Sequence, residues 1–85
     1  MKTFEYTIKD ELGIHARPAG LLAKEAKKYK SRICIIKEEK AAEATRLMAL
    51  MQLAVKCGQT IQVEVEGSDE DAACEGMKHF FENNL

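Results

Sequence analysis

The sequence predicts an α+β open-faced β-sandwich, in which a four-stranded antiparallel sheet is covered on one face by three helices. Segments in which apolar and polar residues alternate have the period of strands with one buried face. Other segments repeat their apolar residues at helical spacing. Along the 85 residues these segments follow the order β, α, β, β, α, β, α. The length leaves room for one domain, residues 1–85.

The first strand is predicted at Thr3–Ile8, where three apolar side chains alternate with polar ones. The segment KDELG that follows is predicted to form a loop. Helical spacing predicts a helix from Arg17 to Lys30. The apolar residues that share one face of this helix are Ala19, Leu22, Ala23, Ala26 and Tyr29.

The middle of the chain allows two interpretations. Arg32–Lys37 is rich in isoleucine and suits a mostly buried strand. Glu38–Gly58 has the composition of one long helix. A single helix over this segment would leave only three strands, and so an odd number of strands in the sheet. The hydroxyl group of Thr45 can cap a shorter helix. We therefore predict an edge strand around Lys40–Glu43 and a helix from about Arg46 to Lys56.

The last strand and helix have clearer signals. Thr60–Glu66 alternates, with Ile61, Val63 and Val65 predicted to face inward. Ser68 with Asp71 resembles a capping box at the start of a final helix. The apolar stripe of this helix consists of Ala73, Met77, Phe80 and Phe81.

Charge and hydropathy exclude several classes of protein. Thirteen Lys and Arg against 14 Asp and Glu give a net charge of −1, which provides no field for sequence-independent binding of nucleic acid or anionic membrane. The longest apolar stretch, Leu47–Met51, is far too short to span a bilayer, and the first residues lack the apolar core of a signal peptide. We expect a cytoplasmic protein with no membrane insertion.

Cysteine and the second histidine are assigned no chemistry. Cys34, Cys57 and Cys74 are odd in number and widely spaced, so we expect buried, reduced thiols and no metal site. His79 is expected to complement the negative end of the last helix. A metal site that joined it to a cysteine would need more ligands than the sequence places nearby.

The segment GIHARPAG, residues 13–20, has the residues of a helix start but the wrong charges. Pro18 suits a first turn, whereas helix starts prefer Ser, Thr, Asp or Asn at the cap and acidic residues after it. This segment offers His15 and Arg17 instead. The free N–H groups and positive end of a helix bind phosphate, and a guanidinium group can add two hydrogen bonds. The same positive field disfavours imidazolium, so His15 is predicted to hold a lone pair able to attack phosphorus.

The motif GIHARPA, with the length, the order of elements and a following cluster of Leu47, Met48 and Met51, resembles the HPr family. These are the histidine-containing phosphocarrier proteins of the phosphoenolpyruvate-dependent sugar phosphotransferase system. The resemblance implies that enzyme I passes a phosphoryl group to Nδ1 of His15, which passes it to enzyme IIA of a sugar permease. Arg17 and the N–H groups of Ala16 and Arg17 would hold the phosphate. The protein would be a carrier and not an enzyme, monomeric, and would need no metal or cofactor.

The resemblance also implies a docking surface for both partners. The residues that match it are Gly20, Lys24, Lys27, Leu47, Met48 and Met51. Methionine side chains repack easily, which suits one surface that serves several partners. Where many HPr proteins carry a regulatory serine, this sequence has Arg46, so we expect that regulatory site to be missing.

Two other classes of function stay open. One is an HPr-like regulatory paralogue, phosphorylated on His15 but serving a nitrogen-related or other dedicated branch by protein binding. The other is a true enzyme in which His15 is a nucleophile or an acid–base group. We do not favour the enzyme, because the sequence offers no second catalytic group near His15.

Overall fold

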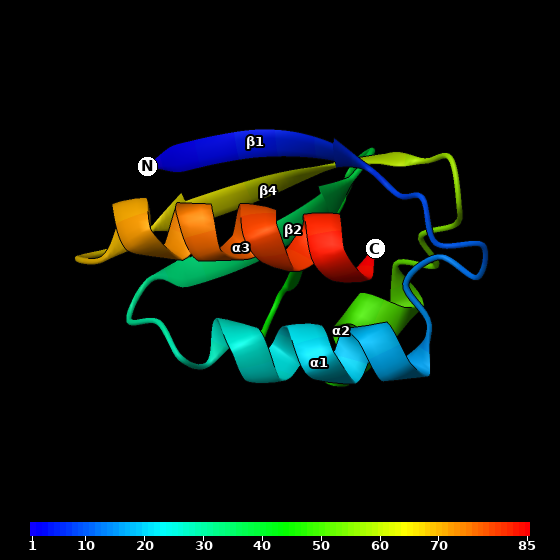
Figure 1. Ribbon diagram of the computed structural model, residues 1–85, viewed down its shortest axis with the longest axis horizontal. Coiled ribbons are helices and arrows are strands. Elements are labelled where there is room, and N and C mark those ends of the chain that lie inside the picture. The colour runs from blue at the N-terminus through cyan, green and yellow to red at the C-terminus, as the bar shows by residue number, and fades with distance from the viewer.

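The computed structural model describes residues 1–85 and has its seven elements in the predicted order (Figure 1). The elements are β1 (Lys2–Thr7), α1 (Ala16–Ala26), β2 (Arg32–Lys37), β3 (Lys40–Glu43), α2 (Leu47–Gln52), β4 (Thr60–Glu66) and α3 (Glu70–Asn84). The predicted fold class is confirmed, and so is the weak edge strand β3. No helix is long and apolar enough to cross a membrane.

The four strands form one antiparallel sheet in the order β1-β4-β2-β3. Alternation puts the β-branched residues of the two central strands on one face, where Ile35 lies opposite Val63 and both are fully buried. The three helices cover this face. The opposite face carries half-buried polar residues such as Gln62 and Glu64, and it is the face without helices.

The core lies between the sheet and the helices and contains 20 buried residues. Leu22 of α1, Leu50 of α2 and Met77 and Phe81 of α3 are completely buried in it. In Figure 1, α1 and α3 run antiparallel, so that the first turn of α1 lies at the same end of the molecule as the last turn of α3. This arrangement brings residues from both ends of the chain to one site.

The first helix is shorter than predicted, since it ends at Ala26 and not at Lys30. The chain turns away there because Asp69, beside the start of α3, holds the next segment. Its carboxylate accepts hydrogen bonds from the backbone N–H of Lys30, at 2.9 Å, and from the hydroxyl of Ser31. Tyr29 therefore packs against the core from a turn and not from the helix.

The second helix is also shorter than predicted and is capped differently. It ends at Gln52, because the backbone of Ala54 takes the left-handed conformation with φ of 53°. The ammonium group of Lys37 fixes this turn by donating to the carbonyl oxygens of Leu53, at 3.1 Å, and Ala54, at 3.0 Å. The predicted cap was wrong: Arg46 occupies the N-cap position with no side-chain hydrogen bond.

The capping box predicted for the last helix was wrong as well. Asp69, and not Ser68, occupies the N-cap position, and its side chain caps nothing because it binds Lys30 and Ser31. The side chain of Glu70 instead accepts a hydrogen bond from the N–H of Gly67 at 3.3 Å. The hydrogen bonds of Asp69 thus connect the start of α3 to the turn that follows α1.

The cysteines differ from one another in exposure, which corrects the expectation that all are buried. Cys74 is buried, Cys34 is half-buried on the open face of the sheet, and Cys57 is exposed. Burial raises the pKa of the Cys34 thiol. Cys57 lies in the turn before β4, where its side chain is exposed.

Candidate functional site

The loop before α1 is fixed on both sides of His15. Gly13 has φ of 70°, and a Cβ atom on it would lie 2.2 Å from the carbonyl oxygen of Val55, so only glycine fits. Ile14 is buried, and its N–H donates to the same oxygen at 3.0 Å. The backbone at His15 is therefore held against the turn that follows α2.

His15 occupies the N-cap position of α1 but does not act as a cap. Its backbone is extended, with φ of −103° and ψ of −173°, and its carbonyl oxygen accepts the N–H of Ala19 at 2.9 Å. Its side chain makes no capping hydrogen bond, and the first turn contains no acidic residue. The N–H groups of Ala16 and Arg17 in that turn have no partner within the helix. The imidazole thus lies at a positive helix end that no carboxylate of its own first turn neutralises.

Arg17 adds an unpaired cation to this helix end. Its side chain takes part in no ion pair and no side-chain hydrogen bond, and the residue is exposed. A guanidinium group in this state can bind an anion through two donors without breaking an existing contact. The three predicted phosphate-site residues, His15, Ala16 and Arg17, are consecutive and share the start of α1.

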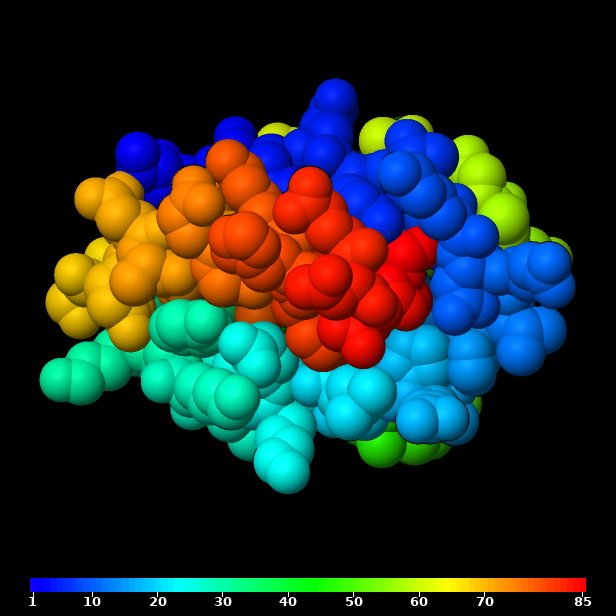
Figure 2. Space-filling model, in the orientation of Figure 1, coloured from blue at the N-terminus to red at the C-terminus, as the bar shows by residue number.

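His15 and Arg17 border a shallow groove of about 260 Å³ between α1 and the end of α3. Figure 2 shows the last turn of α3, in red, next to the loop and first turn of α1, in blue. The groove is lined by Asp10, His15, Arg17, Pro18, Leu21, Asn83 and Asn84. Its polar side chains suit a small anion better than an apolar ligand.

Sequence reasoning missed Asp10, Leu21, Asn83 and Asn84 as residues of this groove. Asp10 had a local signal, because an aspartate in a loop commonly binds the N–H two residues on, as it does here with Leu12 at 2.9 Å. The two asparagines had none, since only the antiparallel packing of α3 on α1 brings them close to His15.

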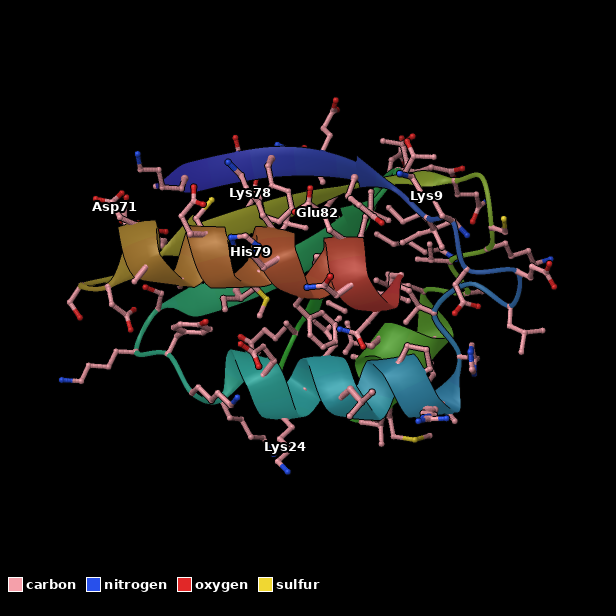
Figure 3. All side chains as sticks on the ribbon, in the orientation of Figure 1. Lys9, Lys24, Asp71, Lys78, His79 and Glu82 are labelled. Carbon is pink, nitrogen blue, oxygen red and sulfur yellow. The ribbon has the colours of Figure 1, made fainter.

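The predicted docking residues lie on the outer surface of α1 and α2. Met48 is 67% exposed, while Leu47 and Met51 are 40% and 39% exposed, and Leu50 between them is buried. Lys24 and Lys27 are exposed, and Gly20 is half-buried. In Figure 3 the side chain of Lys24 extends from α1 away from α3 and the sheet. Leu21 of α1 lines the groove and is 42% exposed.

His79 lies elsewhere, and its predicted role was wrong. It is five residues before the end of α3, and the last turn of that helix contains no basic residue. His79 and its neighbours Lys78 and Glu82 lie on the side of α3 toward β1 (Figure 3). It lines a second shallow groove with Phe4 and Tyr6 of β1. No group of three or more potential metal-ligating side chains occurs in the protein.

Comparisons with known proteins identify relatives over the whole chain. The family model described as the PTS HPr component phosphorylation site matches residues 2–83. The phosphocarrier protein HPr of Mycoplasma capricolum is 42% identical over 78 residues, covering 92% of this chain and 88% of that protein. The HPr-like protein Crh of Halalkalibacterium halodurans is 41% identical over 75 residues, covering 88% and 89%. A solved mycoplasma histidine-containing phosphocarrier protein superposes with a TM-score of 0.93 at 39% identity, covering 96% of this chain and 93% of that one.

Proposed function

The chain belongs to the HPr family of phosphocarrier proteins, and we propose that it relays a phosphoryl group from enzyme I, charged by phosphoenolpyruvate, through His15 to enzyme IIA of sugar permeases. Residues 1–85 would act as one phosphocarrier domain. The observation that carries this proposal is the position of His15 as an N-cap residue whose imidazole caps nothing, beside the unpaired guanidinium of Arg17.

The chemistry follows from that position. The lone pair of Nδ1 of His15 attacks phosphorus and forms an N–P bond, while the bond between phosphorus and the donor breaks and its electron pair returns to the donor. The oxygens of the phosphoryl group then lie where an acidic cap would lie. They accept hydrogen bonds from the N–H groups of Ala16 and Arg17 and from the Arg17 guanidinium.

Release to enzyme IIA reverses these steps. The N–P electron pair returns to Nδ1 as phosphorus bonds to the acceptor. A carrier must not hold the group too tightly, and the shallow, exposed groove supports fast release because water and partner side chains reach it. Phosphoryl transfer depends mainly on positioning and charge stabilisation, which one arginine and two N–H groups supply without a cofactor.

The exposed surface of α1 and α2 supports docking of both partners. Leu47, Met48 and Met51 on α2 supply apolar contact area, and Lys24 and Lys27 on α1 supply positive charge for steering. Leu21 of α1 lines the groove, so α1 carries residues of the groove as well as of this surface. A partner seated on it would reach His15 without a change in the fold.

The test is to incubate the protein with phosphoenolpyruvate and enzyme I and to measure acid-labile, alkali-stable phosphate. We expect one phosphate on the wild-type protein and none on His15→Ala. His79→Ala is the matched control, because it removes the other histidine and should accept phosphate normally. Label on His15→Ala would refute the assignment.

The regulatory paralogue is the second candidate, because one relative, 41% identical over 75 residues, is named HPr-like protein Crh and not phosphocarrier protein HPr. Both candidates accept phosphate on His15, so acceptance alone does not separate them. Onward transfer does: a phosphocarrier passes its label to enzyme IIA proteins of sugar permeases. A phosphorylated protein that keeps its label with all of them would favour the regulatory function.

A further inference from the structure

Asp10 in the loop before α1 is held in place at four points. Its Oδ1 atom accepts the N–H of Leu12 at 2.9 Å, and its carbonyl oxygen accepts the N–H of Gly13 at 2.9 Å. Its own N–H donates to the main-chain oxygen of Leu85 at 2.9 Å. The fourth contact is with His15, whose Nε2 atom lies 3.7 Å from Oδ1. These contacts fix the backbone of Asp10, and the bond from Leu12 orients its carboxylate beside His15.

The contact with His15 distinguishes the two ring nitrogens. An ionised carboxylate only accepts hydrogen bonds, so it favours a proton on Nε2 and disfavours a lone pair there. With the proton on Nε2, the lone pair of a neutral imidazole is on Nδ1. The distance of 3.7 Å exceeds a direct hydrogen bond, and such contacts commonly tighten when a substrate binds.

We propose that Asp10 is a positioning residue, which keeps a proton on Nε2 of His15 during both phosphoryl transfers. This inference rests on the proposed function of His15. During acceptance, Nδ1 donates its electron pair to phosphorus, the N–H bond at Nε2 stays intact, and the ring gains a positive charge that the carboxylate offsets. During release, the N–P electron pair returns to Nδ1, and the ring is again neutral with its proton on Nε2.

The retained proton matters most for release. A phosphorylated ring that has lost its Nε2 proton is a poorer leaving group, because the electron pair would return to an imidazolate. A protonated ring leaves as neutral imidazole. Asp10 thus favours the form of the phosphorylated protein that donates readily, and it does so from the side of the ring that phosphorus does not occupy.

The chain offers a matched control one residue away. Glu11 is exposed and takes part in no ion pair or side-chain hydrogen bond. Glu11→Gln therefore removes the same charge from the same loop without touching His15. Asp10→Asn removes the charge of Asp10 but keeps an oxygen that can accept the N–H of Leu12, so the turn is retained.

The experiment reads the tautomer of His15 directly. Protein labelled with 15N in histidine is observed by NMR at alkaline pH, where imidazole is neutral, and His79 is the internal reference. We expect wild-type and Glu11→Gln proteins to hold the proton of His15 on Nε2, and Asp10→Asn to shift population to the Nδ1–H form. The rate of transfer to enzyme IIA should fall by about tenfold in Asp10→Asn, as for loss of other residues that orient a functional histidine.

The outcomes separate this inference from the proposed function. If Asp10→Asn accepts and donates phosphate at the wild-type rate with an unchanged tautomer, Asp10 has no positioning role and the carrier function stands. If the wild-type protein accepts no phosphate from enzyme I, the proposed function is wrong and the positioning role of Asp10 falls with it. Asp10→Ala, which removes the turn as well as the charge, should transfer no faster than Asp10→Asn; a rate restored to the wild-type value would contradict the role of the carboxylate.

Discussion

The hydroxyl group of Tyr29 lies directly against Gly76 of α3. A Cβ atom on Gly76 would lie 1.8 Å from the Tyr29 hydroxyl oxygen, so glycine is required for this approach. The hydroxyl also donates to the carboxylate of Glu25 at 3.2 Å. The contact joins the turn after α1 to the middle of α3.

Gly76→Ala should therefore destabilise the protein even though alanine favours helices. We expect a loss of about 1–3 kcal/mol in the free energy of unfolding, because the ring must move out of its packed position. Gly20→Ala is the control, since a Cβ atom there meets nothing within 4 Å. That variant should be unchanged or up to about 1 kcal/mol more stable in urea unfolding. Equal stability of Gly76→Ala and wild type would mean that Tyr29 has room to move.

Asp69 should make the protein sensitive to acid. Hydrogen bonds from Ser31 and from the N–H of Lys30 lower the pKa of its carboxyl group below the ordinary 3.8. The carboxyl is ionised more readily when folded, so its contribution to stability is present above the unfolded-state pKa and is lost as the pH falls through the lower folded-state value. Unfolding by urea across the acid range should show this loss. Ser31→Ala removes the largest cause of the shift, so its stability should depend less on pH there; an unchanged dependence would argue against this contact.

Arg17→Ala should slow phosphoryl transfer without abolishing it. The N–H groups of Ala16 and residue 17 remain, and only the guanidinium contacts are lost. A charge-assisted hydrogen bond contributes about 1.5–3 kcal/mol, so we expect the rate to fall by about tenfold or more. Single-turnover transfer from phosphorylated enzyme I measures this rate. Lys30→Ala, which removes an exposed cation beyond the far end of α1 and outside the docking surface, is the control for charge alone. A wild-type rate in Arg17→Ala would remove Arg17 from the mechanism.

Met48→Glu should weaken binding to enzyme I and enzyme IIA. Met48 is 67% exposed, so the substitution leaves the core intact, but docking would desolvate a carboxylate. We expect affinity to fall by about tenfold or more in an NMR titration. Ala72→Glu places the same charge on an exposed residue of α3 and should bind normally. Unchanged binding by Met48→Glu would show that this side of α2 does not dock either partner.

The sequence predicted the strands better than the helix ends, for a physical reason. Strand alternation is local, and Arg32–Lys37, Lys40–Glu43 and Thr60–Glu66 were all predicted with the bounds that they have. The helix ends depend on distant groups. Asp69 holds the turn after α1, and Lys37 fixes the turn after α2. Neither contact leaves a signal at the residues where the helix ends.

The residues of the candidate site also fall into two groups, those that local sequence revealed and those that only tertiary packing brings to the site. His15, Ala16 and Arg17 are consecutive, and their unusual charges at a helix start made them visible in the sequence. Asp10 reaches His15 only through the shape of a turn, and Asn83 reaches the groove only through the packing of α3 on α1. Residues that act through tertiary packing carry no periodic or motif signal of their own.

The ATP-dependent kinase that modifies the regulatory serine of HPr in many Gram-positive bacteria should not modify this protein. The resemblance to HPr matches that serine to Arg46, which has no hydroxyl group and whose Nε atom lies 3.4 Å from a carboxylate oxygen of Glu43. A cation at the start of α2 takes the place of a phosphate that would oppose docking, so the surface around Met48 should stay open to enzyme I.

Thr45, one residue before Arg46, is the nearest hydroxyl group that the kinase could modify. It is exposed, and because it does not cap α2, its hydroxyl group is not occupied by a backbone N–H. Its position one residue before Arg46 nevertheless places it outside the helix start, on a turn in which Arg46 N–H donates to the carbonyl of Glu43 at 3.0 Å. A kinase that requires a hydroxyl group at the N-cap position has no substrate here, because the N-cap residue carries a guanidinium group.

The measurement is to treat His15→Ala protein with that kinase and ATP and to map acid-stable phosphate by mass spectrometry, with Arg46→Ser as the positive control. We expect phosphate on Arg46→Ser alone; stoichiometric phosphate on Thr45 of the protein with Arg46 in place would restore the regulatory switch to this chain.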